Sequence, residues 1–164
     1  MWKLSFFQTS KKDWNFIFPV SSIFVIASLI TAYDYVQIQG MVHGFNIVNI
    51  VGLSLFLIGV SIRVVARKTL GRYFSSGLKI VEEHRLIKHG IYKHIRHPAY
   101  LGSNILSIGI PLFFTSLYGA LIMLGLVPLF LYRIKIEENM LIEKFGDEYR
   151  EYMKNTNKLI PFIY

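Results

Sequence analysis

The sequence predicts an all-α integral membrane protein with about four transmembrane helices, a short helical hairpin over residues 98–132 and a C-terminal helix. Hydrophobic residues make up 53% of the 164 residues and charged residues only 17%, whereas soluble domains carry about 25% charged residues. The charges also avoid three long stretches, each long enough to cross a bilayer: Trp14–Tyr33, Tyr35–Ile62 and Pro98–Tyr132. Together these observations argue against a water-soluble fold.

The first uncharged stretch, between Asp13 and Asp34, predicts one transmembrane helix. A secretory signal peptide is the alternative explanation for an apolar stretch near the N-terminus. The stretch is longer than the 7–15 apolar residues of a signal peptide, and no small-residue cleavage site follows it before Asp34. We therefore expect a retained span.

The second and third stretches predict three further helices. The second holds a span from about Ile47 to Val65, which follows a loop containing glycine. The third is too long for one helix and too short for two full-length helices with a generous loop. Because Thr115-Ser116 and Gly119 mark a tight turn inside it, we expect two short helices, about Ala99–Phe114 and Tyr118–Glu138.

The distribution of Lys and Arg predicts the topology. Of the 18, three precede the first span, nine lie between Arg63 and Arg96, and six follow from Arg133 onward. The positive-inside rule then places both termini and the long middle segment in the cytoplasm. The net charge of +8 is explained by this topology rather than by nucleic-acid binding, which requires a basic face on a folded soluble module. We divide the chain into two N-terminal helices, residues 1–66, and a second half, residues 67–164.

The polar side chains that can do chemistry lie in the second half. Pro98 suits the first turn of a helix, so the third helix is expected to begin at His97-Pro98, with N–H groups that can bind a carboxylate. Arg133 and Glu137 are four residues apart and share a helix face at the membrane exit. This spacing leaves two readings open: an ordinary ion pair at a membrane boundary, or a charged pair that lines a cavity.

Other chemistry finds little support in the sequence. Four of the five histidines lie between His84 and His97, but there is no Cys, no HExxH motif and no nearby Asp. Since a catalytic metal needs about three fixed ligands, no metal site is predicted. No GxSxG, P-loop or GxGxxG pattern follows a strand, so acyl transfer, triphosphate binding and a Rossmann site are not indicated.

In their order along the chain, the motifs of the second half resemble those of the isoprenylcysteine carboxyl methyltransferase family of membrane enzymes. The resemblance runs from about Gly71 to Tyr164, over more than half of the chain. The segments that carry it are Gly71-Arg72-Tyr73-Phe74, His84-Arg85-Leu86-Ile87, Gly90-Ile91-Tyr92, Arg96-His97-Pro98-Ala99-Tyr100-Leu101-Gly102, Arg133-x-x-x-Glu137-Glu138, Phe145-Gly146-Asp147-Glu148-Tyr149 and Leu159-Ile160-Pro161-Phe162.

The resemblance implies methyl transfer from S-adenosylmethionine, with S-adenosylhomocysteine as product, in a cytoplasm-facing pocket closed by the C-terminal segments. It places Arg133 at the substrate end as the catalytic residue. It implies cofactor contacts from the residues that match the family's cofactor motifs: His84, Arg85, Leu86, Ile87, Tyr92, His97, Pro98, Ala99, Tyr100 and Glu137. The residue chemistry agrees, because a carboxylate such as Glu137 favours the ammonium and the sulfonium of this cofactor, and aromatic rings can contact the sulfonium.

The methyl acceptor stays open at this point. The resemblance implies a lipophilic acceptor, first the carboxylate of an isoprenylcysteine-like substrate, which needs no general base. A thiol or an amine headgroup lipid would need a base to take its proton, and Tyr92, Tyr100 or His97 are the candidates. Two other classes remain: an NADPH-dependent membrane reductase of the sterol-reductase type, similar in this region, and a non-catalytic scaffold.

The cellular setting follows from the same observations. We expect a multi-pass integral membrane protein with both termini in the cytoplasm. The absence of a targeting signal and of Cys is compatible with a prokaryotic inner membrane. The oligomeric state is open, because Gly52 and Gly59 are seven residues apart and do not form a GxxxG motif.

Overall fold

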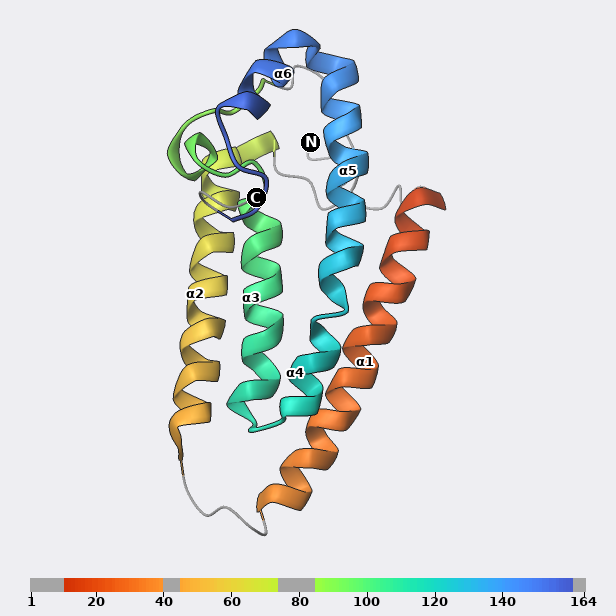
Figure 1. The fold of residues 1–164 in the computed structure, drawn as a ribbon, viewed down its shortest axis with the longest axis vertical. Helices are drawn as coiled ribbons and strands as arrows, with labels where there is room; N and C mark the ends of the chain where they lie inside the picture. The colour runs from red at the N-terminus through yellow and green to blue at the C-terminus, as the bar shows by residue number, and fades with distance from the viewer. Residues whose placement is uncertain (1–10, 40–44, 74–84, 161–164) are drawn as a thin grey trace, which may run out of the picture.

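A computed structural model describes residues 11–39, 45–73 and 85–160 of the chain. Long helices run side by side, the short helix α4 connects two of them, and the short helix α6 lies at one end of the bundle (Figure 1). In chain order the helical elements are α1 (Lys11–Gln39), α2 (Ile47–Leu70), η1 (Gly71–Tyr73), η2 (Gly90–Lys93), α3 (Pro98–Phe113), α4 (Leu117–Met123), α5 (Leu126–Phe145) and α6 (Asp147–Lys154). The all-α prediction is confirmed for the described residues.

Helix α1 is longer than the predicted span and continues through Asp34, at which the prediction ended. The physical reason is a hydrogen bond from the Ser116 hydroxyl to the Asp34 carboxylate at 2.5 Å. Because the charged group is bonded to α4's N-cap residue, the helix need not end where the charge appears.

Helix α2 begins at Ile47, as predicted, because Asn46 caps it. The Asn46 side chain accepts a hydrogen bond from the Val48 amide at 2.8 Å, and the Asn49 side chain accepts one from the Asn46 amide at 2.7 Å. These bonds satisfy amides that have no partner inside the helix. The Asn49 amide group also donates to the Phe113 carbonyl at 2.6 Å, which ties the start of α2 to the end of α3.

Helices α2 and α3 pack backbone against backbone along a seam of four glycines, Gly52 and Gly59 on α2 and Gly102 and Gly109 on α3. A Cβ atom placed at Gly59 would lie 2.5 Å from the Leu106 amide nitrogen, and one at Gly109 would lie 2.5 Å from that of Phe56. Seven residues are nearly two helical turns, so both glycines of each helix face the partner. Gly52 and Gly59 do not form a GxxxG motif, but their seven-residue spacing brings α2 and α3 close together within the chain.

A tight turn joins α3 to α4, as the sequence predicted at Thr115-Ser116. Thr115 has a φ of 60°, and its amide donates to the Leu112 carbonyl at 2.9 Å. The Ser116 hydroxyl then caps α4 by accepting from the Gly119 amide at 2.9 Å. Gly119, which was predicted to mark the turn, lies instead in the first turn of α4.

The helix predicted over Tyr118–Glu138 is in fact two helices, α4 and α5, with a break at Leu124 and Gly125. The Gly125 amide donates to the Ile122 carbonyl at 2.9 Å, a tighter connection than a regular α-helical bond. Past the break, α5 runs without interruption to Phe145, seven residues beyond the predicted end at Glu138.

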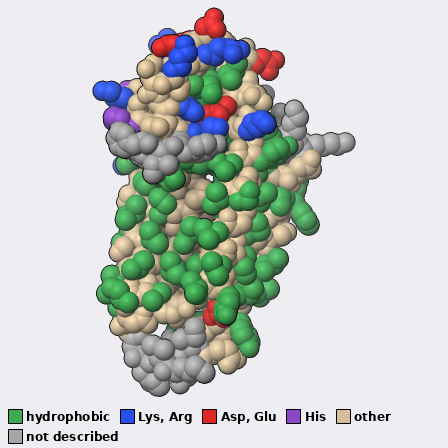
Figure 2. Space-filling model, in the orientation of Figure 1, with side chains coloured by type: hydrophobic (Ala, Val, Ile, Leu, Met, Phe, Trp, Pro, Cys, Tyr) green, Lys and Arg blue, Asp and Glu red, His purple; other side chains and the backbone are tan. Residues whose placement is uncertain are grey.

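Three segments are long and apolar enough to cross a membrane among the described residues: Trp14–Gln37, Ile47–Leu70 and Leu117–Phe145. The 16 residues of α3 rise only about 24 Å, less than the ~30 Å of a hydrocarbon core. Apolar side chains cover the middle of the molecule, while Lys, Arg, Asp and Glu gather at the end near α6 (Figure 2). The first arm of the predicted hairpin, α3, is thus a short helix within a membrane bundle.

Helix α1 packs on α4 and α5 through an apolar cluster. Its buried members are Ala27, Met123, Leu126 and Phe130, against which Phe16, Val20, Ile23 and Phe24 of α1 pack. The cluster also reaches Tyr100 near the start of α3. This packing brings the first helix to the end of the bundle where the charged side chains lie.

Candidate active site

The candidate site lies where the start of α3 meets the second half of α5 (Figure 1). Helix α3 begins at Pro98, as predicted, and His97 is its N-cap residue. The amides of Tyr100 and Leu101 both donate to the His97 carbonyl, at 3.2 Å each. Fewer N–H groups are therefore available to a carboxylate than the sequence alone suggested.

Tyr100 lies beside the two charged residues that the sequence singled out on α5. The negative charge of Glu137 and the positive charge of Arg133 both act on its hydroxyl. A phenol hydroxyl can donate to a carboxylate and accept from a guanidinium, so Tyr100 is suited to lie between the two charges. Arg133 and Glu137 therefore belong to one polar group with α3, rather than forming an ordinary surface ion pair.

Arg133 is nearly fully buried, with 3% of its surface exposed. Its guanidinium carbon lies 4.9 Å from the centre of the Phe16 ring of α1, within range of a cation–π interaction. Phe16 in turn packs on Phe130 with ring centres 5.9 Å apart, and Phe130 packs on Tyr100 at 5.6 Å. One aromatic ring thus lies against a buried cation, and burial strengthens any interaction that this cation makes with an anion.

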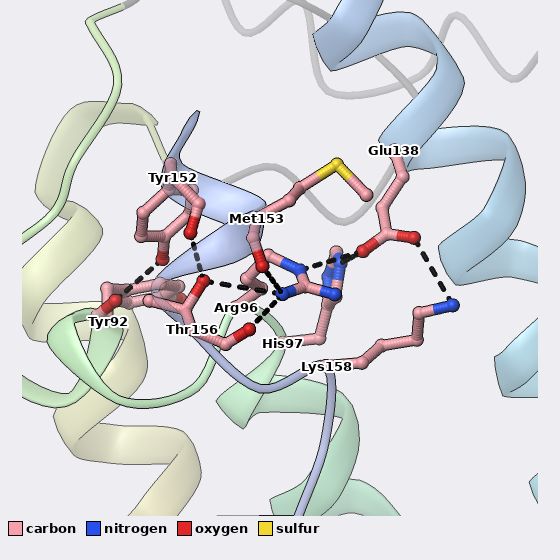
Figure 3. A network of polar contacts seen from close by, with 8 residues as sticks. All are labelled: Tyr92, Arg96, His97, Glu138, Tyr152, Met153, Thr156 and Lys158. Carbon is pink, nitrogen blue, oxygen red and sulfur yellow. Dashed lines mark hydrogen bonds and ion pairs between the residues drawn. The ribbon is translucent and has the colours of Figure 1, made fainter. Parts of the chain in front are cut away.

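A second polar group surrounds Glu138, the next residue on α5 (Figure 3). Its carboxylate accepts from Arg96 Nε at 2.9 Å and lies 3.4 Å from both His97 Nε2 and Lys158 Nζ. The side chains of Arg96 and Glu138 are 8% and 7% exposed. A buried carboxylate is stable only when paired in this way.

The same cluster fastens the C-terminal segment. Arg96 NH1 donates to the carbonyls of Met153, at 3.0 Å, and Thr156. The amide of Arg96 donates to the Asn157 carbonyl at 2.9 Å, and that of His97 donates to the Lys158 carbonyl at 3.1 Å. Residues 156–158 therefore lie along the segment that leads into α3, which agrees with a site closed by the C-terminal segments.

Three buried tyrosines line the same end of the molecule. The Tyr152 hydroxyl donates to the Tyr92 carbonyl at 2.6 Å, and burial raises the pKa of Tyr152 to about 12. Burial, with a smaller contribution from the negative charge of Glu137, raises the pKa of Tyr92 well above its usual value. Tyr149 is 1% exposed, and its pKa is likewise raised by burial. All three hydroxyls are therefore protonated at neutral pH.

Among the described residues, the buried Tyr149 hydroxyl and the buried Asn104 side-chain oxygen have no hydrogen-bond partner. Leaving a buried polar group unpaired costs about 1–3 kcal/mol. The charges of Glu138, Arg96 and Glu137 all act on Tyr149, which places its ring beside both polar groups. An unpaired buried hydroxyl at such a place would gain a hydrogen bond from a polar ligand.

The structure brings many of the predicted site residues to one end of the bundle, where the charges of Arg133 and Glu137 both act on Tyr100. Tyr92 and His97 are buried next to them, Pro98 is fully buried, and Ala99 is half-buried. In the segment before η2, Arg85 is exposed, whereas Leu86 and Ile87 are half-buried. His84 lies outside the described residues.

The sequence reasoning missed the second polar group. Glu138 is predicted only as a neighbour of Glu137, and its partners Arg96 and Lys158 are not among the predicted site residues. The buried Tyr149 and Tyr152 are not among them either. One signal was available, since Arg96 directly precedes His97-Pro98 and Glu138 directly follows Glu137. Consecutive residues on a helix point about 100° apart, so the two glutamates serve two different groups.

Within the described part of the chain, no three His, Asp or Glu side chains converge in a way that could hold a metal ion. His89 and His94 are exposed, and His97 faces Glu138.

The comparison with protein-family models finds a match over residues 50–143, described as the isoprenylcysteine carboxyl methyltransferase (ICMT) family. The matched residues are more than half of the 164-residue chain. They contain the start of α3, Arg133, Glu137 and Glu138. The chain belongs to this family.

Curated relatives and a solved structure agree with the family assignment. The chain is 38% identical over 119 residues to a "Probable protein-S-isoprenylcysteine O-methyltransferase" of Oryza sativa subsp. indica, covering 71% of this chain and 62% of that protein. It is 31% identical over 151 residues to "Protein-S-isoprenylcysteine O-methyltransferase B" of Arabidopsis thaliana, covering 88% and 76%. The solved "eukaryotic intramembrane Ras methyltransferase ICMT" superposes with a TM-score of 0.76 at 28% identity, covering 85% of this chain and 52% of that one.

These relatives fix the coarse description of the chain. It is an integral membrane protein of a methyltransferase family, built as the helical bundle that the sequence predicted. The chain spans 62% of the rice relative and about half of the solved ICMT chain. Family membership favours the methyltransferase prediction over the reductase and scaffold alternatives.

Proposed function

We propose that this protein is a membrane-embedded methyltransferase that transfers a methyl group from S-adenosylmethionine to a lipophilic acceptor, the carboxylate of an isoprenylcysteine-like substrate. One observation carries the proposal: the buried Arg133 and the carboxylate of Glu137 both act on the Tyr100 hydroxyl, at the charged end of a membrane bundle. A cation for an acceptor carboxylate and an anion for a positively charged methyl donor are thus held side by side. The family assignment supports the same reaction.

The residues present fit this cofactor. When bound, it supplies a methyl group on a sulfonium, which a carboxylate oxygen accepts while the carbon–sulfur bond breaks and the sulfur keeps the electron pair. Glu137 would attract the positive charges of the cofactor, and the buried Tyr149 hydroxyl would find a partner in its polar groups. The other proposed contacts are those of the sequence: His84, Arg85, Leu86, Ile87, Tyr92, His97, Pro98, Ala99 and Tyr100.

Arg133 is proposed as the catalytic residue that holds the acceptor. A guanidinium binds a carboxylate through two parallel hydrogen bonds, which fix the direction from which the oxygen approaches the methyl group. No proton has to move, so the site needs no general base. A thiol or amine acceptor would need one, and burial keeps Tyr92, one of the three candidates, protonated rather than basic. We propose the carboxylate acceptor because it needs no such base and because a buried guanidinium suits an anion.

The placement in the cell follows the charges. We propose that the charged end, with α6 and the Glu138 cluster, faces the cytoplasm, as the positive-inside rule requires, and that both termini lie on that side. A prokaryotic inner membrane is our proposal for the compartment. We also propose a division of the chain into residues 1–66 and residues 67–164, with the boundary in the last turns of α2. The second part carries the proposed cofactor contacts.

Binding of S-adenosylhomocysteine to the detergent-purified protein, measured by calorimetry, tests the proposal. We expect saturable binding that is lost in Glu137→Ala and kept in Glu143→Ala, which removes an exposed carboxylate from the same helix. Circular dichroism establishes that each variant is folded. A folded wild-type protein that does not bind S-adenosylhomocysteine would overturn the methyltransferase proposal.

A further inference from the structure

We infer that Phe16 of α1 is a positioning residue for the acceptor: its ring lies against the Arg133 guanidinium and leaves the acceptor carboxylate to bind this group from the sides that the ring does not cover. The inference rests on the proposed function and deepens it. Phe16 lies outside residues 50–143, to which the family model matches. Phe16 would give α1 a part in recognising the acceptor, through its contact with Arg133.

The geometry of Phe16 differs from that of the other apolar residues on its face of α1. Val20, Ile23 and Phe24 continue the same stripe and pack on the apolar cluster formed with α4 and α5. Phe16 alone is placed with a guanidinium above its ring, at 4.9 Å from the ring centre. The Phe16 ring therefore offers its aromatic face to a cation as well as filling space.

A ring against a guanidinium restricts how an anion can bind. The N–H groups point outward in the plane of the guanidinium, so a carboxylate binds at a free edge of that plane. The tilted ring contacts from Phe16 through Phe130 to Tyr100 also join α1 to the residue whose hydroxyl lies near the same cation. Phe16 therefore limits the positions open to the Arg133 guanidinium and excludes water from one side of it, and both effects help to align an acceptor oxygen.

Removal of the Phe16 ring should affect the use of the acceptor and not the binding of the cofactor product. Phe16 contacts Arg133 and Phe130, whereas the proposed cofactor carboxylate, Glu137, lies one helical turn further along α5. Loss of the ring should weaken use of the acceptor and leave the binding of S-adenosylhomocysteine unchanged. Loss of packing alone would affect both equally, through the folded fraction of the protein.

The test compares Phe16→Leu with Phe24→Leu. Both replace a half-buried Phe on the same face of α1, but only Phe16 lies against Arg133. The acceptor probe is N-acetyl-S-farnesylcysteine, assayed by methyl transfer, and the cofactor readout is the dissociation constant of S-adenosylhomocysteine. For Phe16→Leu we expect kcat/KM for the acceptor to fall about tenfold with the dissociation constant within about twofold. Phe16→Trp, which restores an aromatic face, should recover most of the loss.

Two outcomes would overturn the inference while leaving the proposed function intact: equal effects of Phe16→Leu and Phe24→Leu, or no recovery in Phe16→Trp although it folds. Failure of the wild-type protein to bind S-adenosylhomocysteine would instead contradict the proposed function itself. The two failures are therefore distinguishable.

Discussion

Arg96 and Glu138 form a buried ion pair, with Arg96 Nε donating to the carboxylate at 2.9 Å. The pair joins three parts of the chain that are far apart in sequence, because Arg96 also donates to the Met153 carbonyl in the C-terminal segment. Arg96 precedes α3 directly, so the pair locates the start of that helix against α5. The relative positions of Tyr100 on α3 and Arg133 on α5 depend on it.

Replacement of Glu138 with Gln should therefore destabilise the protein strongly. Gln keeps the shape of the side chain but removes the negative charge that the buried Arg96 guanidinium faces. Breaking one partner of a buried ion pair costs about 3–5 kcal/mol. Thermal unfolding in detergent, followed by circular dichroism, measures the effect.

The matched control for Glu138 is Glu151→Gln. Glu151 also pairs with a lysine, Lys154, at 3.2 Å, but both side chains are exposed. Exposed pairs contribute about 0–1 kcal/mol, so this variant should unfold close to the wild-type temperature. Equal destabilisation by the two substitutions would contradict the role assigned to burial.

The glycine seam predicts a strong effect from a single methyl group. In Gly59→Ala the added Cβ would meet the backbone of α3, 2.5 Å from the Leu106 amide nitrogen. Either the helices separate or the variant unfolds more easily, by about 1–3 kcal/mol. Ser54→Ala, on the exposed side of α2, is the control and should change stability little. The midpoint of thermal unfolding, measured for both variants, should fall for Gly59→Ala only. A wild-type midpoint for Gly59→Ala would contradict the close packing of α2 on α3.

Tyr152 predicts how stability changes at alkaline pH. Its pKa rises from 10.0 to about 12 on folding because the hydroxyl is buried, so folding favours the protonated form. The resulting stability is complete below pH 10, declines as the unfolded chain ionises between pH 10 and pH 12, and is lost above about pH 12.

In Tyr152→Phe, one such titrating group is absent. The free energy of unfolding should then fall less steeply between pH 10 and pH 12, by up to about 1.4 kcal/mol per pH unit. Denaturant titrations across this range measure the slope for both proteins. Parallel slopes would show that Tyr152 has the same pKa folded and unfolded.

Arg133→Lys separates charge from geometry at the proposed acceptor site. Lysine keeps the positive charge but offers no planar pair of donors, so alignment of the acceptor should suffer more than cofactor binding. We expect kcat to fall about 10- to 100-fold, the scale at which small misplacements act, with S-adenosylhomocysteine affinity nearly unchanged. Methyl-transfer kinetics with N-acetyl-S-farnesylcysteine provide the measurement, and unaltered acceptor kinetics would refute the role of Arg133.

The sequence by itself determined the membrane architecture and the family. Long uncharged stretches predict spanning helices because each charged side chain in hydrocarbon raises the free energy by itself, whatever the rest of the fold is. The start of α2 at Ile47 and of α3 at Pro98 were predictable for a similar reason, since caps and proline act within one turn. The pairing of Arg133 with Glu137 on one face followed from helix periodicity.

Only the tertiary structure decided how these elements meet. The break at Gly125, the glycine seam and the Glu138 cluster all depend on contacts between residues far apart in the chain. The position of Phe16 over Arg133 is of the same kind, because α1 and α5 are separated by three other helices in sequence. Pattern and propensity describe a helix and its faces, but which face meets which partner is set by packing over the whole bundle.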